Sequence, residues 1–246
     1  MVEEKKINEA ILRIAYLLAA SDGNVKPDER ESFAQSLRSI DGFVFGEPEA
    51  NAFLESVVED GRKLAILADF YDDEERIKAF MHRVTPEILV LKDNKHALRR
   101  AFAAWIDICI SDKDYSAFEE RLVKGLQIIF NKLHENPLLA VEISSVFGSI
   151  FGARGKTSEV TISLSPEFVE LLGNAAMCTD VEYGENSCIP DSYIEEVKSR
   201  CLAIKDVSGK LAKSKSKADK ESFGETLKFL VAAMKEFVDD VEPLQA

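Results

Sequence analysis

The stretch Ser21-Asp22-Gly23-Asn24-Val25-Lys26-Pro27-Asp28-Glu29 has a weaker second copy in this chain. The copy begins 90 positions later, as Ser111-Asp112-Lys113-Asp114, and continues through Tyr115 to Glu119. In both copies an acidic residue leads a turn, a hydrophobic residue follows three positions later and a glutamate follows seven positions later. Because one helix-turn-helix unit cannot bury its apolar face alone, the repeat predicts an all-α fold of helical hairpins packed about a pseudo-twofold axis.

Apolar residues precede both turns at helical spacing. Before the first turn, residues 3–20 form an amphipathic helical pattern whose apolar positions are Ile7, Ala10, Ile11, Ile14, Ala15, Leu17 and Leu18. The matching stripe before the second turn consists of Leu98, Ala101, Phe102, Trp105, Ile108 and Cys109. The two stripes align at three positions, namely Ile11 with Ala101, Ala15 with Trp105, and Leu18 with Ile108. The repeat therefore extends beyond the turns.

Further helices are predicted along the rest of the chain. Pro27 suits the first position of a helix to about residue 40, and shorter helical pieces follow over residues 48–59, 61–70 and 72–83. The acidic run Asp72 to Glu75 is expected to cap a helix start, and Thr85, before Pro86, is expected to cap a new helix. The remaining predicted helices are 117–133, a helix opened by Ser165-Pro166-Glu167 that ends near Met177, 191–207 and 219–241, with a loop over residues 178–190.

Length and composition indicate a folded protein of one or two domains. The chain has 246 residues, of which 46% are apolar. We predict a repeated helical domain over residues 1–135 and a helical extension or second small domain over residues 136–246. In the second region an apolar stripe over 139–151 is expected to dock on the first domain, with a partner or a membrane surface as alternatives. Residues 158–165 alternate polar and apolar side chains and are expected to be an extended linker, with a strand as the alternative.

The net charge of −13 is divided almost evenly between the two regions, at −7 and −6. Such an acidic surface argues against DNA or RNA as the main partner and favours cations or basic partner surfaces. No apolar run reaches the roughly 18 to 20 residues that a membrane-spanning helix needs. The four cysteines and three histidines show no metal-binding spacing, so reduced thiols and a cytoplasmic location are expected.

One basic cluster interrupts this acidic pattern. It consists of Lys210, Lys213, Lys215, Lys217 and Lys220, interleaved with serines. Because no aromatic residue alternates with these lysines, the stacking contribution to single-strand binding is missing. A solvated linker or exposed helix surface is the favoured interpretation, with anionic lipid head groups or an acidic partner as alternatives.

The two turns supply hard oxygen ligands of the kind that calcium or magnesium prefers. The candidate ligands are Asp22, Asn24, Asp28 and Glu29 in the first copy, and Asp112, Asp114 and Glu119 in the second. If the two turns face one another across the pseudo-twofold axis, a divalent cation would relieve the repulsion between their carboxylates. The sequence therefore offers a divalent cation as the expected cofactor.

The same residues also have a purely structural interpretation, which spacing alone favours. Ser116 followed three residues later by Glu119 is a capping box, in which each side chain satisfies a free backbone amide at a helix start. Asp22 and Asp112 can form local side-chain turns, and Gly23 can end the first helix in the left-handed conformation. Under this interpretation the turns bind no metal.

The stretch from Leu17 to Glu29 resembles the signature of the tellurite-resistance TerB family and its TerB-like relatives. The resemblance covers roughly residues 1–135, and the second copy departs from the pattern at Lys113, where glycine is usual. It implies an all-helical, internally repeated fold and a role in bacterial responses to tellurite and other stresses. It also implies a metal-linked role for Asp22, Glu29, Asp112 and Glu119. Residues 136–246 resemble no family.

Three functional hypotheses follow from these observations. The preferred one is a cytoplasmic, non-enzymatic stress-response protein that binds divalent cations or protein partners through its acidic turns. The alternative is an interaction module without metal, whose carboxy-terminal helices form the docking surface. A metal-dependent hydrolase is the third, although no glycine-rich phosphate loop or nucleophile elbow is present.

Overall fold

The computed structural model describes residues 2–21, 55, 57–64, 71–110, 115–139, 165–177 and 180–239. Within these residues the fold is all-α, as the repeat predicted. The helices are α1 (Val2–Ala19), α4 (Asp73–Leu91), α5 (Lys95–Cys109), α6 (Ala117–Glu135), α8 (Pro166–Met177), α9 (Asp191–Lys213) and α10 (Lys217–Asp239), and residues 57–64 are also helical. No helix among the described residues is long and apolar enough to cross a membrane.

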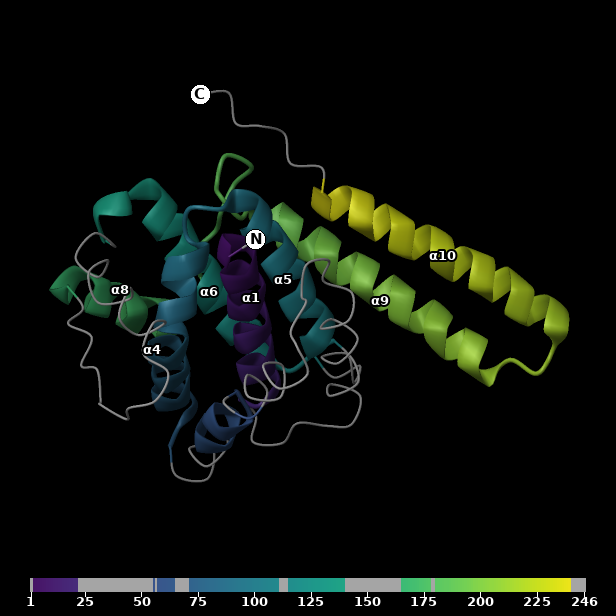
Figure 1. Cartoon of the computed structure of the whole chain (residues 1–246), viewed down its shortest axis with the longest axis horizontal. Helices are drawn as coiled ribbons and strands as arrows, with labels where there is room; N and C mark the ends of the chain where they lie inside the picture. The colour runs from purple at the N-terminus through teal and green to yellow at the C-terminus, as the bar shows by residue number, and fades with distance from the viewer. Residues whose placement is uncertain are drawn as a thin grey trace.

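Helix α1 lies at the centre of the body, against α4 and α5 (Figure 1). Its apolar stripe is buried as predicted, and Ile14, Ala15, Leu17 and Leu18 are completely inaccessible to solvent. The indole Nε1 of Trp105 donates a hydrogen bond of 2.9 Å to the carbonyl oxygen of Ile11. This bond joins the two stripes that the sequence repeat aligns, because the donor belongs to α5 and the acceptor to α1.

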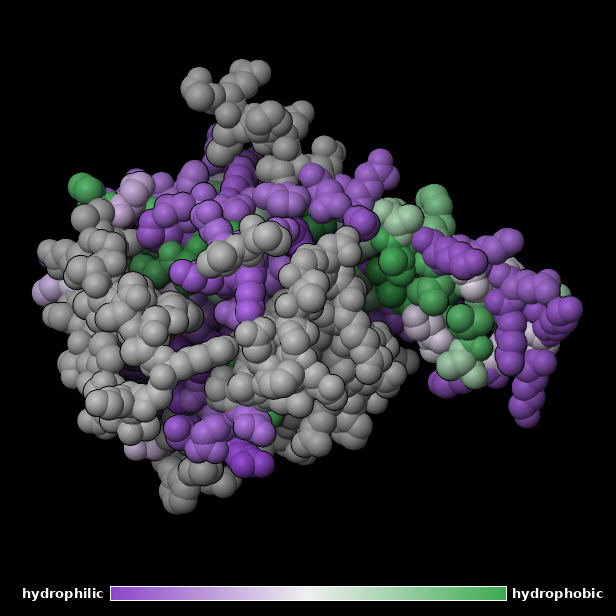
Figure 2. All heavy atoms as spheres, viewed as in Figure 1, coloured by the Kyte–Doolittle hydropathy of each residue, from purple (hydrophilic) through white to green (hydrophobic). Residues whose placement is uncertain are grey.

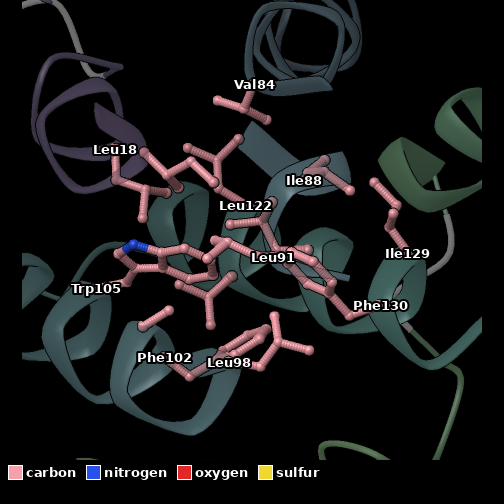
Figure 3. Packing of buried hydrophobic residues seen from close by; sticks show 14 of the residues in the cluster. Leu18, Val84, Ile88, Leu91, Leu98, Phe102, Trp105, Leu122, Ile129 and Phe130 are labelled. Atoms are coloured by element: carbon pink, nitrogen blue, oxygen red, sulfur yellow. The ribbon is translucent and has the colours of Figure 1, made fainter. Parts of the chain in front are cut away.

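Aromatic rings from α5 and α6 fill the middle of the core. The ring centroid of Trp105 lies 4.9 Å from that of Phe102 and 6.2 Å from that of Phe130. Figure 3 shows these three side chains pointing toward one another, with Leu18 of α1 and Ile88 of α4 above them. All three rings are fully buried, so they contribute both a large apolar area and favourable ring geometry to stability.

Helix α4 corrects one prediction. The expected break at Thr85 does not occur, and the helix runs through Pro86 to Leu91. Proline removes one backbone hydrogen bond, and the buried Thr85 hydroxyl donates to the carbonyl oxygen of Met81 at 2.9 Å. Ile88 and Leu91 extend the buried stripe begun by Ile77, so their burial outweighs the cost of the proline. Asp72 caps the helix start as predicted, since its carboxylate accepts from the Glu75 amide.

Helix α8 packs against α4 and α6. Its start is the predicted one, with the Ser165 hydroxyl accepting from the Phe168 amide at 3.2 Å. Gly125 of α6 lets the two helices approach closely, because a side chain there would meet Met81 and the carbonyl oxygen of Ala175. Buried residues of α8 and α9 belong to the same hydrophobic cluster as those of α1, α4, α5 and α6.

Helices α9 and α10 form an antiparallel hairpin that extends away from the body (Figure 1). Both helices of the hairpin contact α5, and on α9 this contact reaches Cys201 and Lys205, which interact with Asp107. Helix α9 continues to Lys213, six residues beyond the predicted end near residue 207, and passes through Gly209. A glycine inside a helix costs about 1 kcal/mol, and packing against α10 outweighs that cost. Helix α10 begins at Lys217, close to the predicted start.

Several predictions fall outside the described residues. They are the helix over residues 27–40, most of the pieces over residues 48–59 and 61–70, the apolar stripe beyond Leu139 and the segment 158–164. The pseudo-twofold relation between two hairpins involves the first of these and stays a prediction.

Candidate functional site

The predicted cation ligands are mostly outside the described residues. This applies to Asp22, Asn24, Asp28, Glu29, Asp112 and Asp114. Glu119 is described, at the start of α6. Among the described residues, no three histidine, cysteine, aspartate or glutamate side chains are grouped so that they could hold a metal ion. The cation site therefore stays a prediction.

Glu119 forms the capping box that the structural interpretation predicted. Its Oε2 atom accepts hydrogen bonds from the Ser116 amide at 2.8 Å and from the Ser116 hydroxyl at 2.7 Å. In return the Ser116 Oγ accepts from the Glu119 amide at 3.2 Å. The Glu119 residue is only 4% exposed. One oxygen of this carboxylate is thus already used to hold the first turn of α6.

The two interpretations of this turn predict different responses to cations. If Glu119 acts as a cap, Ser116→Ala should lower the free energy of unfolding by about 1 kcal/mol, equally in chelator and in excess calcium. Urea unfolding followed by circular dichroism measures this. A calcium-induced rise in wild-type stability that disappears in Glu119→Gln would instead assign the carboxylate to a cation. Glu170→Gln, on the surface of α8, is the matched control.

The described cysteines are poor candidates for nucleophilic chemistry. Cys109, Cys188 and Cys201 are buried thiols outside any disulfide. Burial raises the pKa of the Cys188 thiol, and burial together with the nearby Asp107 carboxylate raises the pKa of the Cys201 thiol. Since the thiolate is the reactive form, both groups are held in their unreactive state.

A groove of about 490 Å³ separates the first turns of α6 from those of α9. Asp191 lies in it, and its Oδ1 accepts from the Lys124 amine at 2.9 Å and from the Gln127 amide at 2.7 Å. Its Oδ2 accepts from the Tyr183 backbone amide at 2.9 Å. Partial burial opposes ionisation, but these hydrogen bonds, led by that from Lys124, outweigh it and lower the pKa of Asp191.

Lys198 of α9 forms a second ion pair across the groove, with Glu120 of α6. The Lys198 amine lies 2.8 Å from a carboxylate oxygen of Glu120 and 3.4 Å from one of Glu195. Burial acts against the charged amine, but the hydrogen bond and charge of Glu120 outweigh it and raise the pKa of Lys198. The Lys124–Asp191 and Lys198–Glu120 ion pairs therefore hold the base of α9 against α6. Sequence analysis missed them because the paired residues are 67 and 78 positions apart.

The hairpin carries the largest exposed apolar side chains of α9 and α10. Phe229 is 72% exposed, Val231 50% and Leu202 49%. We call Phe229 and Leu202, which lie near the middles of the two helices, the hairpin patch. Val231 follows Phe229 by two positions, so it faces a different side of α10. Figure 2 shows apolar atoms at the surface over the middle of the hairpin and hydrophilic atoms at its far end. Single exposed apolar residues are ordinary, but a group of them on an element outside the core is typical of a contact surface.

The turn of the hairpin carries the lysine cluster. Residues 210–220, here called the basic tip, include five lysines and one aspartate, which give a net charge of +4. All five lysines are exposed, as predicted from the sequence. The total net charge of the chain is −13, so the remainder carries −17. The basic tip is therefore a positively charged region of an otherwise acidic chain, and it lies at the far end of the α9–α10 hairpin.

Several contacts hold the base of the hairpin in one orientation. The rings of Tyr193 and Phe237 stack with their centroids 5.4 Å apart. Arg200 donates to the carbonyl oxygen of Ala233 at 3.2 Å, and its guanidinium lies 4.5 Å from the Phe237 ring centroid. The Tyr193 hydroxyl donates to the Arg99 carbonyl oxygen at 2.7 Å. The hairpin is thus fixed both within itself and to α5.

No family model matches the chain, and neither a curated protein nor a solved structure matches it. The resemblance of residues 17–29 to the TerB family accordingly stays a prediction.

Proposed function

We propose that this chain is a non-enzymatic protein-interaction module that engages an acidic protein surface through its α9–α10 hairpin. The observation that carries the proposal is the combination of the hairpin patch with the basic tip on an element that projects from the core. The acidic turns then serve as helix caps, the role that Glu119 performs at the start of α6. A bacterial, cytoplasmic stress-response setting belongs to the proposal on the strength of the TerB-like stretch alone.

The hairpin patch supplies the affinity. Burying a phenylalanine or leucine side chain removes apolar surface from water and is favourable by about 1.5–3 kcal/mol per residue. In the isolated chain Phe229 is mostly exposed, so that free energy becomes available only when a partner covers it. The fixed orientation of the hairpin reduces the entropy lost on binding, because Tyr193 and Arg200 already hold its base.

The basic tip selects the partner. A body with a charge of −17 repels an acidic protein at most approaches, whereas the tip attracts it. Complementary charge fixes the orientation of binding and raises the association rate, and like charges elsewhere disfavour wrong orientations. The partner surface is therefore expected to combine an apolar site for Phe229 with carboxylates that reach the tip lysines.

Cation binding by the acidic turns is a separate proposal. It rests on the TerB-like resemblance and on residues outside the described part of the chain. Calorimetric titration of the chelator-treated protein with calcium, magnesium, manganese and zinc, beside Asp22→Ala/Asp112→Ala, tests it directly.

Placing a photo-crosslinking amino acid at position 229 should trap the partner. We expect discrete crosslinked products from position 229 and far weaker ones from position 138, where Leu138 is 76% exposed and follows α6, outside the two hairpin helices. Phe229→Ser should reduce co-purification of the trapped protein at least about tenfold, since removing a central aromatic contact typically costs 2 kcal/mol or more, while Leu138→Ser should leave it unchanged. Mass spectrometry identifies the products. Equal products from both positions would contradict the proposal.

A further inference from the structure

We infer that the hairpin binds a second copy of this chain. Two hairpins lie antiparallel about a twofold axis through their middles, so that the basic tip of each contacts the base of the other. The inference rests on the proposed function of the hairpin as a docking surface and names one partner for it.

The first support is the position of the hairpin patch. Leu202 is the twelfth of the 23 residues of α9, which is its midpoint. Phe229 is the thirteenth of the 23 residues of α10. In a twofold interface each residue contacts the reciprocal surface of the partner, and residues near the axis meet their own counterparts. Apolar side chains at the middle of both helices would therefore lie close to the twofold axis and contact their counterparts in the second copy.

The second support is the charge order of α10. Lys217 and Lys220 occupy its first turn together with Asp219, which gives that turn a net charge of +1. Glu236 and Asp239 follow Lys235 at the other end, which gives residues 235–239 a net charge of −1. This order is unfavourable for the helix dipole, because the amino-terminal end is already positive and the carboxy-terminal end negative. Sequences keep charges that destabilise their own helix mainly where those charges have another function, such as binding. Antiparallel pairing provides one, since it brings Lys217 and Lys220 close to Glu236 and Asp239 of the second copy.

Two of these four residues have a weak, exposed partner within the chain, since Lys217 lies 4.0 Å from Glu221 and Asp239 lies 4.0 Å from His96. At the tip, α9 ends with Lys210 and Lys213, so its own lysines stabilise the negative carboxy-terminal end of its dipole, without α10. At the base, Lys198 and Arg200 already pair with glutamates, the first with Glu120 and Glu195 and the second with Glu196. Glu236 and Asp239 therefore present negative charge at the base of a hairpin whose tip carries +4.

The third support is the size of the surface. A helix of 23 residues is about 35 Å long, and two adjacent helices are about 20 Å wide, so one face of the hairpin offers about 700 Å². A stable protein–protein interface buries about 800 Å² per partner. Pairing along the whole hairpin approaches that area, whereas contact at the tip alone is far below it.

Light scattering on the full-length chain tests the inference. The wild type should have twice the monomer mass at high concentration and dissociate on dilution. Phe229→Ser should raise the dissociation constant at least about tenfold, because two symmetry-related copies of the contact are lost, and Leu138→Ser should have no effect. A wild type that stays monomeric at every concentration, or a Phe229→Ser protein that associates like the wild type, would overturn the inference.

A charge exchange tests the antiparallel order. Lys217→Glu/Lys220→Glu reverses the tip and Glu236→Lys/Asp239→Lys reverses the base. Both changes improve the charges of α10 for its own dipole, so weaker association cannot be attributed to a weaker helix. Each variant alone should associate at least about tenfold more weakly than the wild type, and a one-to-one mixture should regain wild-type affinity as a heterodimer, since both of its tip-to-base contacts are complementary. A mixture that does not recover would overturn the inference.

Failure of this inference is distinguishable from failure of the proposed function. If the wild type is monomeric while position 229 still traps a different acidic protein, the hairpin is a docking surface for that protein and the second copy is excluded. If position 229 traps neither this chain nor another protein, both are wrong.

Discussion

Trp105→Ala is expected to lower the free energy of unfolding by about 3–5 kcal/mol, which is a large part of the 5–15 kcal/mol typical of a domain. The side chain is completely buried between Phe102 and Phe130, so its removal leaves a cavity that neighbouring rings cannot fill. The substitution also removes the hydrogen bond from α5 to the Ile11 carbonyl oxygen of α1. Both effects weaken the packing between α1 and α5, two of the central helices.

Urea unfolding followed by far-ultraviolet circular dichroism measures this change. Tryptophan fluorescence cannot, because Trp105 is the single tryptophan of the chain. Trp105→Phe retains most of the ring volume and should cost less than Trp105→Ala, since it loses the hydrogen bond, worth about 1 kcal/mol, and only a small part of the buried ring. Val169→Ala, at a position 43% exposed on α8, is the control and should cost less than about 0.5 kcal/mol. A Trp105→Ala cost as small as that of the control would contradict the core described above.

The free energy of unfolding of the wild type is expected to fall by about 3 kcal/mol as the pH rises from about 4.5 to 7, and Glu87→Gln is expected to abolish this fall. Burial raises the pKa of the Glu87 carboxyl to about 7, against the opposing effects of Arg13 and Arg83. Its Oε1 atom lies 3.1 Å from the Arg13 Nε. Among the described residues its Oε2 atom has no hydrogen-bond partner, so ionisation is only partly compensated.

The direction of the pH effect follows from proton binding. Below about pH 4.5 the carboxyl is protonated in both the folded and the unfolded chain, and it imposes no cost. Between about pH 4.5 and 7 it ionises in the unfolded chain and remains protonated in the folded one, so the free energy of unfolding falls as pH rises. Above about pH 7 it is ionised in both, and the cost stays constant.

Comparison of wild type and variant isolates this contribution. Arg13 of α1, Arg83 of α4 and Asp60 of the helical segment 57–64 form the ion pairs around Glu87, and Lys6 and Glu9 line the same small cavity. These groups are retained in Glu87→Gln, so the difference between the two stability–pH curves reports position 87. The curves should diverge by about 3 kcal/mol between pH 5 and 8. Parallel curves, such as those expected for the exposed control Glu170→Gln, would show that the carboxyl titrates normally.

The periodicity of apolar residues was sufficient to predict α1 and α5. In each case the residues at three- and four-residue spacing are the ones that the core buries, because a helix can bury only one stripe and the sequence must place apolar residues along it. The capping box at Ser116 and the cap at Ser165 were also predictable, since both depend on residues only three positions apart.

Tertiary packing overruled local signals at two places. Pro86 is an ordinary helix-breaking signal, yet α4 continues through it because Ile88 and Leu91 are buried on the same side as Ile77. Gly209 suggests an early end to α9, yet the helix continues to Lys213 beside α10. At Pro86 the burial of Ile88 and Leu91 exceeds a local cost of about 3 kcal/mol, and at Gly209 the contact of α9 with α10 exceeds a cost of about 1 kcal/mol. No window of sequence shows what a distant helix will cover.

The sequence alone determined the helical class, the main apolar stripes, the capping roles and the exposed lysine cluster, since each depends on residues close in the chain. Only the tertiary structure decided which residues far apart in sequence meet. It paired Lys124 with Asp191 across 67 positions, buried Glu87 beside Arg13, and extended the lysine cluster away from the core on a hairpin with Phe229 exposed. These features arise from helix packing, where the free energy depends on distance in space and not on separation along the chain.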